Sequence, residues 1–159
     1  MSTRDRAQFL GPTALEKLPD AFIKIQRRKF KLTLYKRAGR EFDIQPWVCR
    51  IAVGAIKFDT PAKPYLVLGK ESPPTYTAPN SQWALDAGFK PGEKLPHDHP
   101  ANPLRGAFLW LDDHGIGIHG TPNLLSLGTR ASHGCIRVSE EDAIYLYNNV
   151  PLGTNVLVI

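Results

Sequence analysis

The sequence predicts a mainly β domain, a sandwich of sheets with one short helix near the C-terminal end. Apolar and polar residues alternate with a period of two between Phe30 and Ile56, which is typical of half-buried strands. The 43-residue stretch from Pro61 to Pro103 holds nine of the fourteen prolines, so it leaves little room for helix or central strand. A clear helical period appears only after Ser139.

Length and composition agree with one folded domain. The chain has 159 residues, of which 42% are hydrophobic and 22% charged, close to the averages for globular proteins. No apolar run approaches the roughly 18 residues that a membrane helix requires. Residues 1–24 show no charged start followed by an apolar stretch, so we expect neither a membrane span nor a secretion signal within this chain.

The net charge of +5 resides in the first third of the chain. Residues 1–50 hold 12 basic and 5 acidic residues, whereas residues 51–159 hold 8 and 10. Such a basic run could meet nucleic acid, an anionic membrane surface or an anionic polymer. A solvated strand edge is the simpler interpretation, and no nucleic-acid motif accompanies it, so no nucleic-acid partner is expected. The run comprises Arg27, Arg28, Lys29 and Lys31.

Turn residues divide the alternating segments into strands. Ala38-Gly39 and Asp113-His114 each separate two such segments, which predicts two hairpins. The expected strands are Lys29–Lys36 and Arg40–Gln45 (first hairpin), Trp47–Ala55, Pro64–Gly69, Gly106–Asp112 and Gly115–His119 (second hairpin), and Asn155–Ile159.

The long proline-rich loop, about 61–103, is not a polar linker. It carries Trp83, Leu85, Phe89 and Leu95, and loops of this length in compact domains are usually functional or covering elements. We therefore expect it to pack over the sheet.

One helix is expected at about 140–149. Ser139 is followed by three acidic residues, an arrangement that favours a helix N-terminus. Ala143, Leu146, Tyr147 and Val150 then share one face. The helix should end near Asn149, before Pro151.

The reactive side chains gather late in the chain. His119, His133 and Cys135 lie within seventeen residues. A thiol is a useful nucleophile as its thiolate, and a neighbouring imidazole can accept its proton. Gly134 would let the backbone turn tightly, so that its amide and that of Cys135 could face a developing oxyanion. A buried, inert thiol remains the alternative.

Residues 115–143, GIGIHGTPNLLSLGTRASHGCIRVSEEDA, resemble the signature of the L,D-transpeptidase catalytic domain (YkuD type), in which a His-Gly pair precedes a Ser/Thr-His-Gly-Cys element. Asn102-Pro103-Leu104 and Val53-Gly54 also resemble family features. The resemblance implies a β-sandwich of mixed sheets over residues 28–159, with residues 1–27 as an N-terminal extension of unknown role.

The resemblance also implies roles for individual residues. Cys135 would be the nucleophile and His119 the general base and acid, oriented by the Gly120 carbonyl. The amides of Gly134 and Cys135 would form the oxyanion hole. Substrate-binding or site-shaping roles would fall to His133, Ser132 and Arg137, although many members have Asn at the position of Arg137.

By the same resemblance, the chain is expected to be a peptidoglycan L,D-transpeptidase. Such an enzyme attacks the stem-peptide amide between the L-centre of the third residue and a terminal D-amino acid, and an amine acceptor resolves the acyl-enzyme. Stem peptides would be both donor and acceptor, and the location would be the bacterial cell envelope, periplasmic or extracytoplasmic. The alternatives are a hydrolytic L,D-carboxypeptidase and a non-catalytic wall-binding module. The sequence leaves the oligomeric state open.

No cofactor or metal is expected. His97-Asp98-His99 lies in the proline-rich loop, far from the other histidines, and is more simply a polar surface segment than a ligand set. Cys49 shares the apolar face of its strand and is read as a small buried hydrophobe, with a Cys49–Cys135 disulfide as the alternative. Trp83 and Trp110 could line a substrate groove, but core filling is the simpler role for Trp110.

Overall fold

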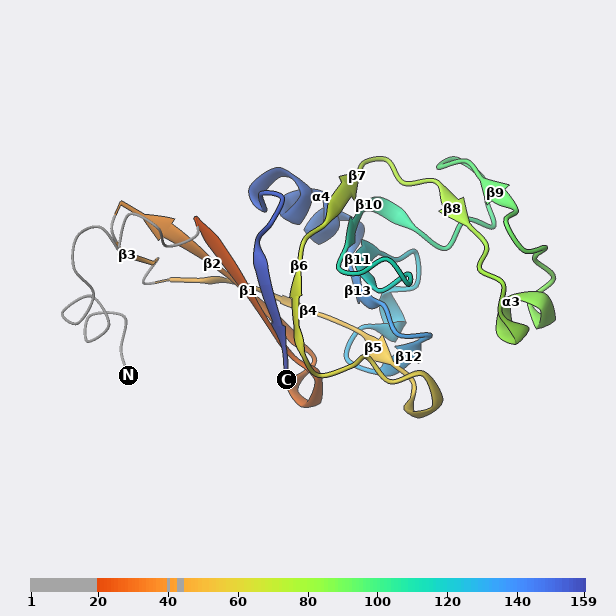
Figure 1. Cartoon of the computed structure of the whole chain (residues 1–159), viewed down its shortest axis with the longest axis horizontal. Coiled ribbons are helices and arrows are strands. Elements are labelled where there is room, and N and C mark those ends of the chain that lie inside the picture. The colour runs from red at the N-terminus through yellow and green to blue at the C-terminus, as the bar shows by residue number, and fades with distance from the viewer. Residues whose placement is uncertain (1–19, 40, 43–44) are drawn as a thin grey trace.

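The computed structural model describes residues 20–39, 41–42 and 45–159. Two mixed β-sheets pack face to face, as expected, and a loop-rich lobe extends from the second sheet (Figure 1). Residues 1–19 of the expected N-terminal extension lie outside the described residues.

The first sheet has the strand order β3-β2-β1-β14-β6, with β4 paired to β2. β1 and β14 run parallel and their other neighbours run antiparallel. The β2–β3 pair confirms the first predicted hairpin. The strands are β1 (Ala21–Gln26), β2 (Lys31–Ala38), β3 (Glu41–Phe42), β4 (Trp47–Arg50), β6 (Pro64–Leu66) and β14 (Asn155–Val158).

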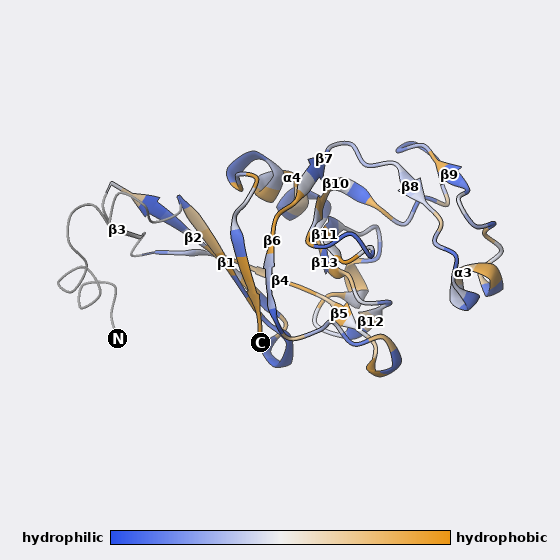
Figure 2. Cartoon of the chain, viewed as in Figure 1, coloured by the Kyte–Doolittle hydropathy of each residue, from blue (hydrophilic) through white to orange (hydrophobic). Residues whose placement is uncertain are grey.

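β1 corrects the expected domain boundary at residue 28. Its residues are alternately buried and half-buried, and the hydrophobic colour of Figure 2 runs along it. Because β1 lies between β2 and β14, it is a central strand of the sheet, and the domain begins before Ala21.

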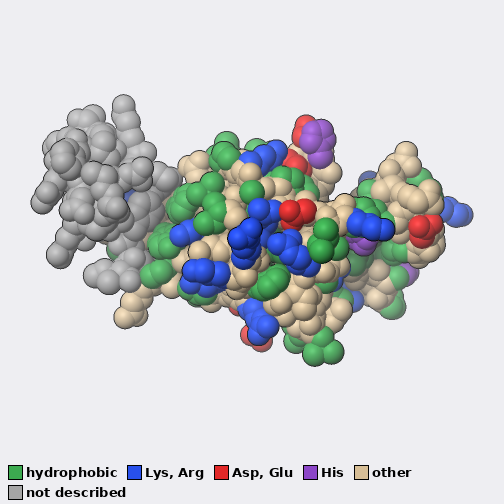
Figure 3. Space-filling model, turned by 90° about the horizontal axis from the view of Figure 1, so that it is seen from below, with side chains coloured by type: hydrophobic (Ala, Val, Ile, Leu, Met, Phe, Trp, Pro, Cys, Tyr) green, Lys and Arg blue, Asp and Glu red, His purple; other side chains and the backbone are tan. Residues whose placement is uncertain are grey.

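Arg27–Lys29 form a 3-10 turn between β1 and β2, so most of the basic run lies in a turn rather than along a strand edge. Lysine and arginine side chains gather in the middle of the face shown in Figure 3.

The second sheet has the order β13-β11-β10-β7. β10 and β11 are antiparallel and form the second predicted hairpin, whereas β11 and β13 are parallel. Two small pairs, β12 with β5 and β8 with β9, complete the strands. The bounds are β7 (Gly69–Glu71), β10 (Arg105–Trp110), β11 (Gly117–Gly120), β13 (Ile136–Val138), β5 (Val53–Gly54), β12 (Arg130–Ser132), β8 (Tyr76–Thr77) and β9 (Lys94–Leu95).

Two expected strands are each divided between two sheets. The segment 47–55 pairs with β2 as β4, then crosses over and pairs with β12 as β5. At the crossing, Ala52 exchanges two backbone hydrogen bonds with Arg137. The segment 64–69 likewise pairs with β14 as β6, and the chain then joins β10 as β7. Residues 51–54 are all buried and β7 is half-buried throughout. In the sequence, apolar residues still recur at every second position from Trp47 to Ala55, so the sequence pattern does not reveal the first change of partner.

The helix α4 (Glu140–Asn149) confirms the prediction for the C-terminal region. The Ser139 hydroxyl accepts a hydrogen bond from the Asp142 amide at 3.1 Å, which satisfies one free N–H of the first turn. α4 packs against β10 and β11 and buries Ala143 and Leu146. A second helix, α3 (Gln82–Asp86), lies in the proline-rich stretch and was not anticipated. The 3-10 turns Ile56–Phe58 and Leu124–Ser126 complete the helical elements of the described ranges.

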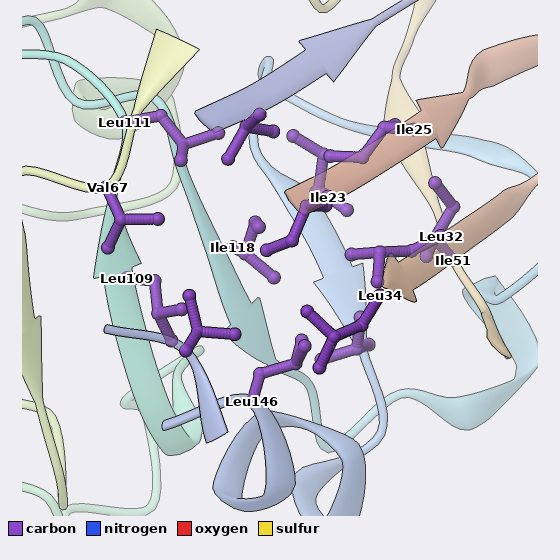
Figure 4. Close-up of a cluster of buried hydrophobic side chains, with 14 of the residues drawn as sticks. Ile23, Ile25, Leu32, Leu34, Ile51, Val67, Leu109, Leu111, Ile118 and Leu146 are labelled. Atoms are coloured by element: carbon purple, nitrogen blue, oxygen red, sulfur yellow. The ribbon is translucent and has the colours of Figure 1, made fainter. Parts of the chain in front are cut away.

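The main core lies between the two sheets and is closed on one side by α4 (Figure 4). Ile23 and Leu34 of the first sheet and Leu109 and Ile118 of the second are almost completely buried. A smaller cluster forms on the other face of β10, around Phe108, where the proline-rich loop contributes Tyr76 and Leu95. That loop therefore packs over the outer face of the second sheet, as predicted.

Candidate active site

The alternation of side chains along β11 and β13 places the reactive groups on the outer face of the second sheet. Ile118 and Ile136 are register partners and both point into the core. Residues one position away point to the opposite face. His119 therefore shares this outer face with Arg137, its partner on β13, and with Cys135, two residues before Arg137.

His119 is 6% exposed, and its ring lies parallel to that of Phe108, with centroids 5.7 Å apart. Its Nδ1 is 2.8 Å from the Gly120 carbonyl oxygen. Because a carbonyl can only accept, Nδ1 carries the proton and Nε2 is left as a bare acceptor. Burial lowers the pKa of His119 to about 4, so the ring is neutral and able to take a proton near pH 7.

Gly120 is required at its position for steric reasons. A Cβ atom there would overlap the carbonyl oxygen of Arg105 on β10 and press against Glu140 in the first turn of α4. The close approach fixes the Gly120 peptide, whose carbonyl in turn orients His119. The His-Gly pair of the sequence thus combines an imidazole with the backbone group that sets its tautomer.

Cys135 is half-buried, and its thiol donates to the Gly115 carbonyl oxygen at 3.2 Å. Burial raises the pKa of the thiol to about 11, partly offset by a hydrogen bond from the Gly117 backbone and by the positive charge of Arg137. The resting pair is therefore a neutral thiol and a neutral imidazole. A nucleophilic role for Cys135 would require that the thiol lose its proton during the attack.

The turn that carries Cys135 is stabilised by the Ser132 hydroxyl. Ser132 Oγ donates to the Cys135 carbonyl at 2.5 Å and accepts from the Gly134 amide at 3.2 Å. Gly134 has φ of 120°, a conformation that residues with a Cβ rarely adopt. The Gly134 amide thus donates within the turn, and the expectation that it and the Cys135 amide form an oxyanion hole stays a prediction. Ser132 itself is a residue of the turn, with its hydroxyl used inside it.

His133 lies between two aromatic rings. The Trp83 indole of α3 stacks on it with centroids 3.8 Å apart and 8° between the planes, and Phe58 contacts it edge-on at 4.8 Å. Burial and the charge of Arg137 both lower the pKa of His133. Its contacts with Trp83 and Phe58 show how His133 shapes the wall beside Cys135.

A cavity of about 690 Å³ opens over this face of the sheet. His119, His133, Cys135 and Arg137 line one side of it, and Thr75–Thr77, Pro79–Ser81, Trp83 and Phe89 of the loop-rich lobe line the other. Trp110 packs on the smaller core cluster and also lines the cavity, so it combines both of the roles considered for it. The structure thus brings together all the predicted site residues except Gly120 and Gly134, whose backbone groups lie behind the lining.

Three polar side chains of the cavity wall lack a partner, and of these only Arg137 is exposed enough to reach a ligand. The Arg137 guanidinium, half-buried, has no hydrogen-bond or carboxylate partner within the described ranges. The Tyr76 and Ser81 hydroxyls are buried and have no partner among the described residues. Neither Tyr76 nor Ser81 was singled out from the sequence, because nothing local connects the proline-rich loop with Cys135.

The remaining candidates behave as ordinary structural groups. Cys49 is 7% exposed in the main core and is a free thiol, like Cys135, which confirms the buried-hydrophobe interpretation over the disulfide. Burial raises the pKa of the Cys49 thiol far above its ordinary value. Across the described ranges, no three His, Cys, Asp or Glu side chains are placed to hold a metal ion. Nor does any helix described here have the length and apolar character needed to cross a membrane.

Comparison with known protein families identifies this arrangement. The L,D-transpeptidase catalytic domain, YkuD, matches residues 20–158. Probable L,D-transpeptidase ErfK/SrfK of Escherichia coli K12 is 33% identical over 149 residues, which cover 89% of this chain and 46% of the relative. Probable L,D-transpeptidase YbiS of the same organism is 32% identical over 87% of this chain and 45% of the relative. The chain thus spans about half the length of these relatives.

Solved structures agree with the fold. An L,D-transpeptidase from Mycobacterium tuberculosis H37Rv matches with a TM-score of 0.64 and 25% identity, over 89% of this chain and 58% of that one. L,D-transpeptidase 3 from the same species matches with a TM-score of 0.65 and 23% identity, over 89% of this chain and 61% of that one.

Proposed function

This chain belongs to the L,D-transpeptidase catalytic domain family, and we propose that it is a cysteine acyltransferase that acts on peptidoglycan stem peptides. One observation carries the proposal. The Cys135 thiol and the His119 imidazole, the latter oriented by the Gly120 carbonyl, lie on one face of two neighbouring strands and line one cavity. The sequence motif together with this geometry supports nucleophilic acyl transfer.

Acylation follows from the protonation states of the pair. As Cys135 Sγ attacks the amide carbonyl of the donor peptide, its proton moves to Nε2 of His119, and the π electrons of the carbonyl move onto oxygen. Collapse of this tetrahedral intermediate breaks the carbon–nitrogen bond. The terminal D-amino acid leaves as an amine that takes its proton from His119, and a thioester to Cys135 remains.

Resolution of the thioester runs the same steps in reverse. An amine of a second stem peptide gives up a proton to His119, attacks the thioester carbonyl and expels the Cys135 thiol, which forms a cross-link. Water in the place of the amine would give a trimmed stem, which is carboxypeptidase activity. The same thioester can be attacked by an amine or by water, and neutral His119 can accept the proton from either one.

Substrate recognition falls to the unpartnered guanidinium of the cavity wall. We assign the Arg137 guanidinium to the terminal carboxylate of the donor, because a half-buried cation without a partner favours an anion. Since peptidoglycan lies outside the cytoplasmic membrane, we place the activity in the bacterial cell envelope.

The test is intact mass spectrometry of the wild type and Cys135→Ala after exposure to a carbapenem, an acylating agent that mimics a donor peptide. We expect one adduct on the wild type and none on Cys135→Ala. A folded wild-type protein with a free thiol and no adduct would sink the acyltransferase proposal and favour a wall-binding module. Incubation with a tetrapeptide stem then separates cross-linking from hydrolysis by the mass of the product.

A further inference from the structure

Thr60 is a buried hydroxyl residue that lies behind the catalytic turn. It is 0% exposed and follows β5 by a short loop. Its Oγ1 donates to the Gly134 carbonyl oxygen at 2.8 Å and accepts from the Gly54 amide at 3.0 Å. Thr60 thus holds the peptide unit that joins Gly134 to Cys135, although 74 positions separate it from Gly134.

The orientation of that peptide unit determines where the Cys135 amide points. The Gly134–Cys135 bond is trans, so the Cys135 N–H points opposite to the Gly134 carbonyl. Since that carbonyl points toward Thr60, the N–H points away from Thr60, and Cys135 itself lines the cavity. We propose that Thr60 is a positioning residue that aims the Cys135 amide at the oxyanion formed during acylation. The inference rests on the proposed acyltransferase function.

The Cys135 amide is important for stabilising the oxyanion because the adjacent Gly134 amide already has a hydrogen-bond partner. The Gly134 amide, the other expected oxyanion donor, already donates to Ser132 Oγ. The Cys135 N–H has no hydrogen-bond partner among the described residues. It can therefore donate to the oxyanion when the sulfur–carbon bond forms and the carbonyl electrons move onto oxygen. Its alignment should therefore govern the rate of acylation.

The loop that carries Thr60 is itself stabilised by the basic turn between β1 and β2. Arg27 Nη1 donates to Asp59 Oδ2 at 2.7 Å and to the Thr60 carbonyl at 2.9 Å. Arg130 donates to the other oxygen of Asp59 at 3.0 Å. Gly54 is required here, because a Cβ atom at this position would overlap the Phe58 carbonyl. These contacts set Thr60 in place before any substrate binds.

Thr60→Val tests the proposal, because it keeps the shape of the side chain and removes the hydroxyl. Two reactions of Cys135 are followed. Acylation by a carbapenem passes through an oxyanion, whereas alkylation by iodoacetamide displaces iodide at a CH₂ group and forms none. We expect Thr60→Val to slow acylation by about ten- to a hundredfold, less than the loss of a whole oxyanion donor. The alkylation rate should stay within about twofold of the wild type, and Thr60→Ser should restore acylation.

Thr154→Val is the matched control. Thr154 is 4% exposed and its hydroxyl donates to the Pro151 carbonyl at 2.7 Å, in the turn between α4 and β14. Thr154→Val should lose about as much stability as Thr60→Val, but its acylation rate should equal that of the wild type. Thr60→Ala repeats the loss of the donor without the added methyl group, in case Thr60→Val does not fold.

Equal acylation rates in the wild type and the folded Thr60→Val or Thr60→Ala variant would overturn the proposal. So would a parallel loss of acylation and alkylation, since that pattern indicates a displaced thiol rather than a misaligned amide. Absence of carbapenem acylation in the wild type is a different result, because it rejects the acyltransferase function itself.

Discussion

The Trp83 indole lies flat against the His133 imidazole, with ring centroids 3.8 Å apart. One ring comes from the five-residue helix α3 of the proline-rich lobe, and the other from the turn that carries Cys135. This contact links the lobe to the turn that carries Cys135. The shape of the site beside Cys135 therefore depends on a segment about fifty residues away in the chain.

Replacement of Trp83 by leucine should impair the site without unfolding the domain, because Trp83 is half-buried and lies outside the main core. We expect carbapenem acylation to slow by about tenfold, since loosely held groups lose near-attack geometry. Leu85→Ala is the control, because Leu85 belongs to the same helix but is 45% exposed. Equal acylation rates for the two variants, measured by stopped-flow absorbance, would contradict this role of the stack.

The pH dependence of the two Cys135 reactions should differ. Acylation needs a neutral His119 to take the proton of the thiol, so its rate should stay level from about pH 5 to 10 and fall as pH drops through about 4, where His119 becomes protonated. Alkylation by iodoacetamide needs the thiolate, so its rate should keep rising until about pH 11. A plateau of alkylation at neutral pH would instead reveal a thiolate–imidazolium pair at rest.

His119→Asn should separate the base from its orientation. The asparagine amide can still donate to the Gly120 carbonyl, but it offers no group that accepts the thiol proton. We expect acylation to fall by at least about a hundredfold, the usual contribution of a general base, with circular dichroism unchanged. The acylation rate of His119→Ala should fall at least as far.

Cys49→Ala should be acylated at the wild-type rate. Loss of acylation in a folded Cys49→Ala protein would contradict the inert role of Cys49.

Arg137→Gln tests recognition of the donor carboxylate. Loss of one charge-assisted hydrogen bond should raise KM by about ten- to a hundredfold for a stem ending in a free carboxylate. A stem with an amidated end serves as the matched substrate, and its KM should hardly change. Removal of the positive charge should also raise the pKa of His119, because Arg137 contributes to lowering it. A similar rise in KM for both stems would assign Arg137 another role.

Tyr76→Phe removes a buried hydroxyl that has no partner among the described residues. The free energy of unfolding should therefore stay level or increase, since no hydrogen bond is lost. KM for the stem peptide should stay within about twofold, because the buried hydroxyl has almost no surface that a ligand could contact. Tyr65→Phe is the control, because the Tyr65 hydroxyl donates to the Pro61 carbonyl at 3.2 Å far from the cavity. That variant should lose about 2–4 °C in Tm and keep its activity, a contrast that thermal melts and steady-state kinetics will check.

Local patterns in the sequence were enough for several elements. The two hairpins, the C-terminal strand and the helix after Ser139 are encoded by turn residues, a capping serine and short-range periodicity, all of which act within about ten residues. The reactive pair of His119 and Cys135 was also visible, because both residues belong to one short motif. Each of these features depends on residues close together in the sequence, and each is present in the structure.

Contacts between distant segments were decided only by the tertiary structure. The chain changes sheets after Arg50 and again after Leu66, and the sequence pattern marks neither change, because periodicity records which face is buried and not which strand is the partner. Two hydrogen bonds at the Cys135 turn were likewise not predicted from the sequence. Thr60 donates to the Gly134 carbonyl, and the Gly134 amide donates to Ser132 Oγ. A short motif was enough to name the candidate reactive groups, whereas their orientation depends on packing, because it is set by contacts between segments far apart in the chain.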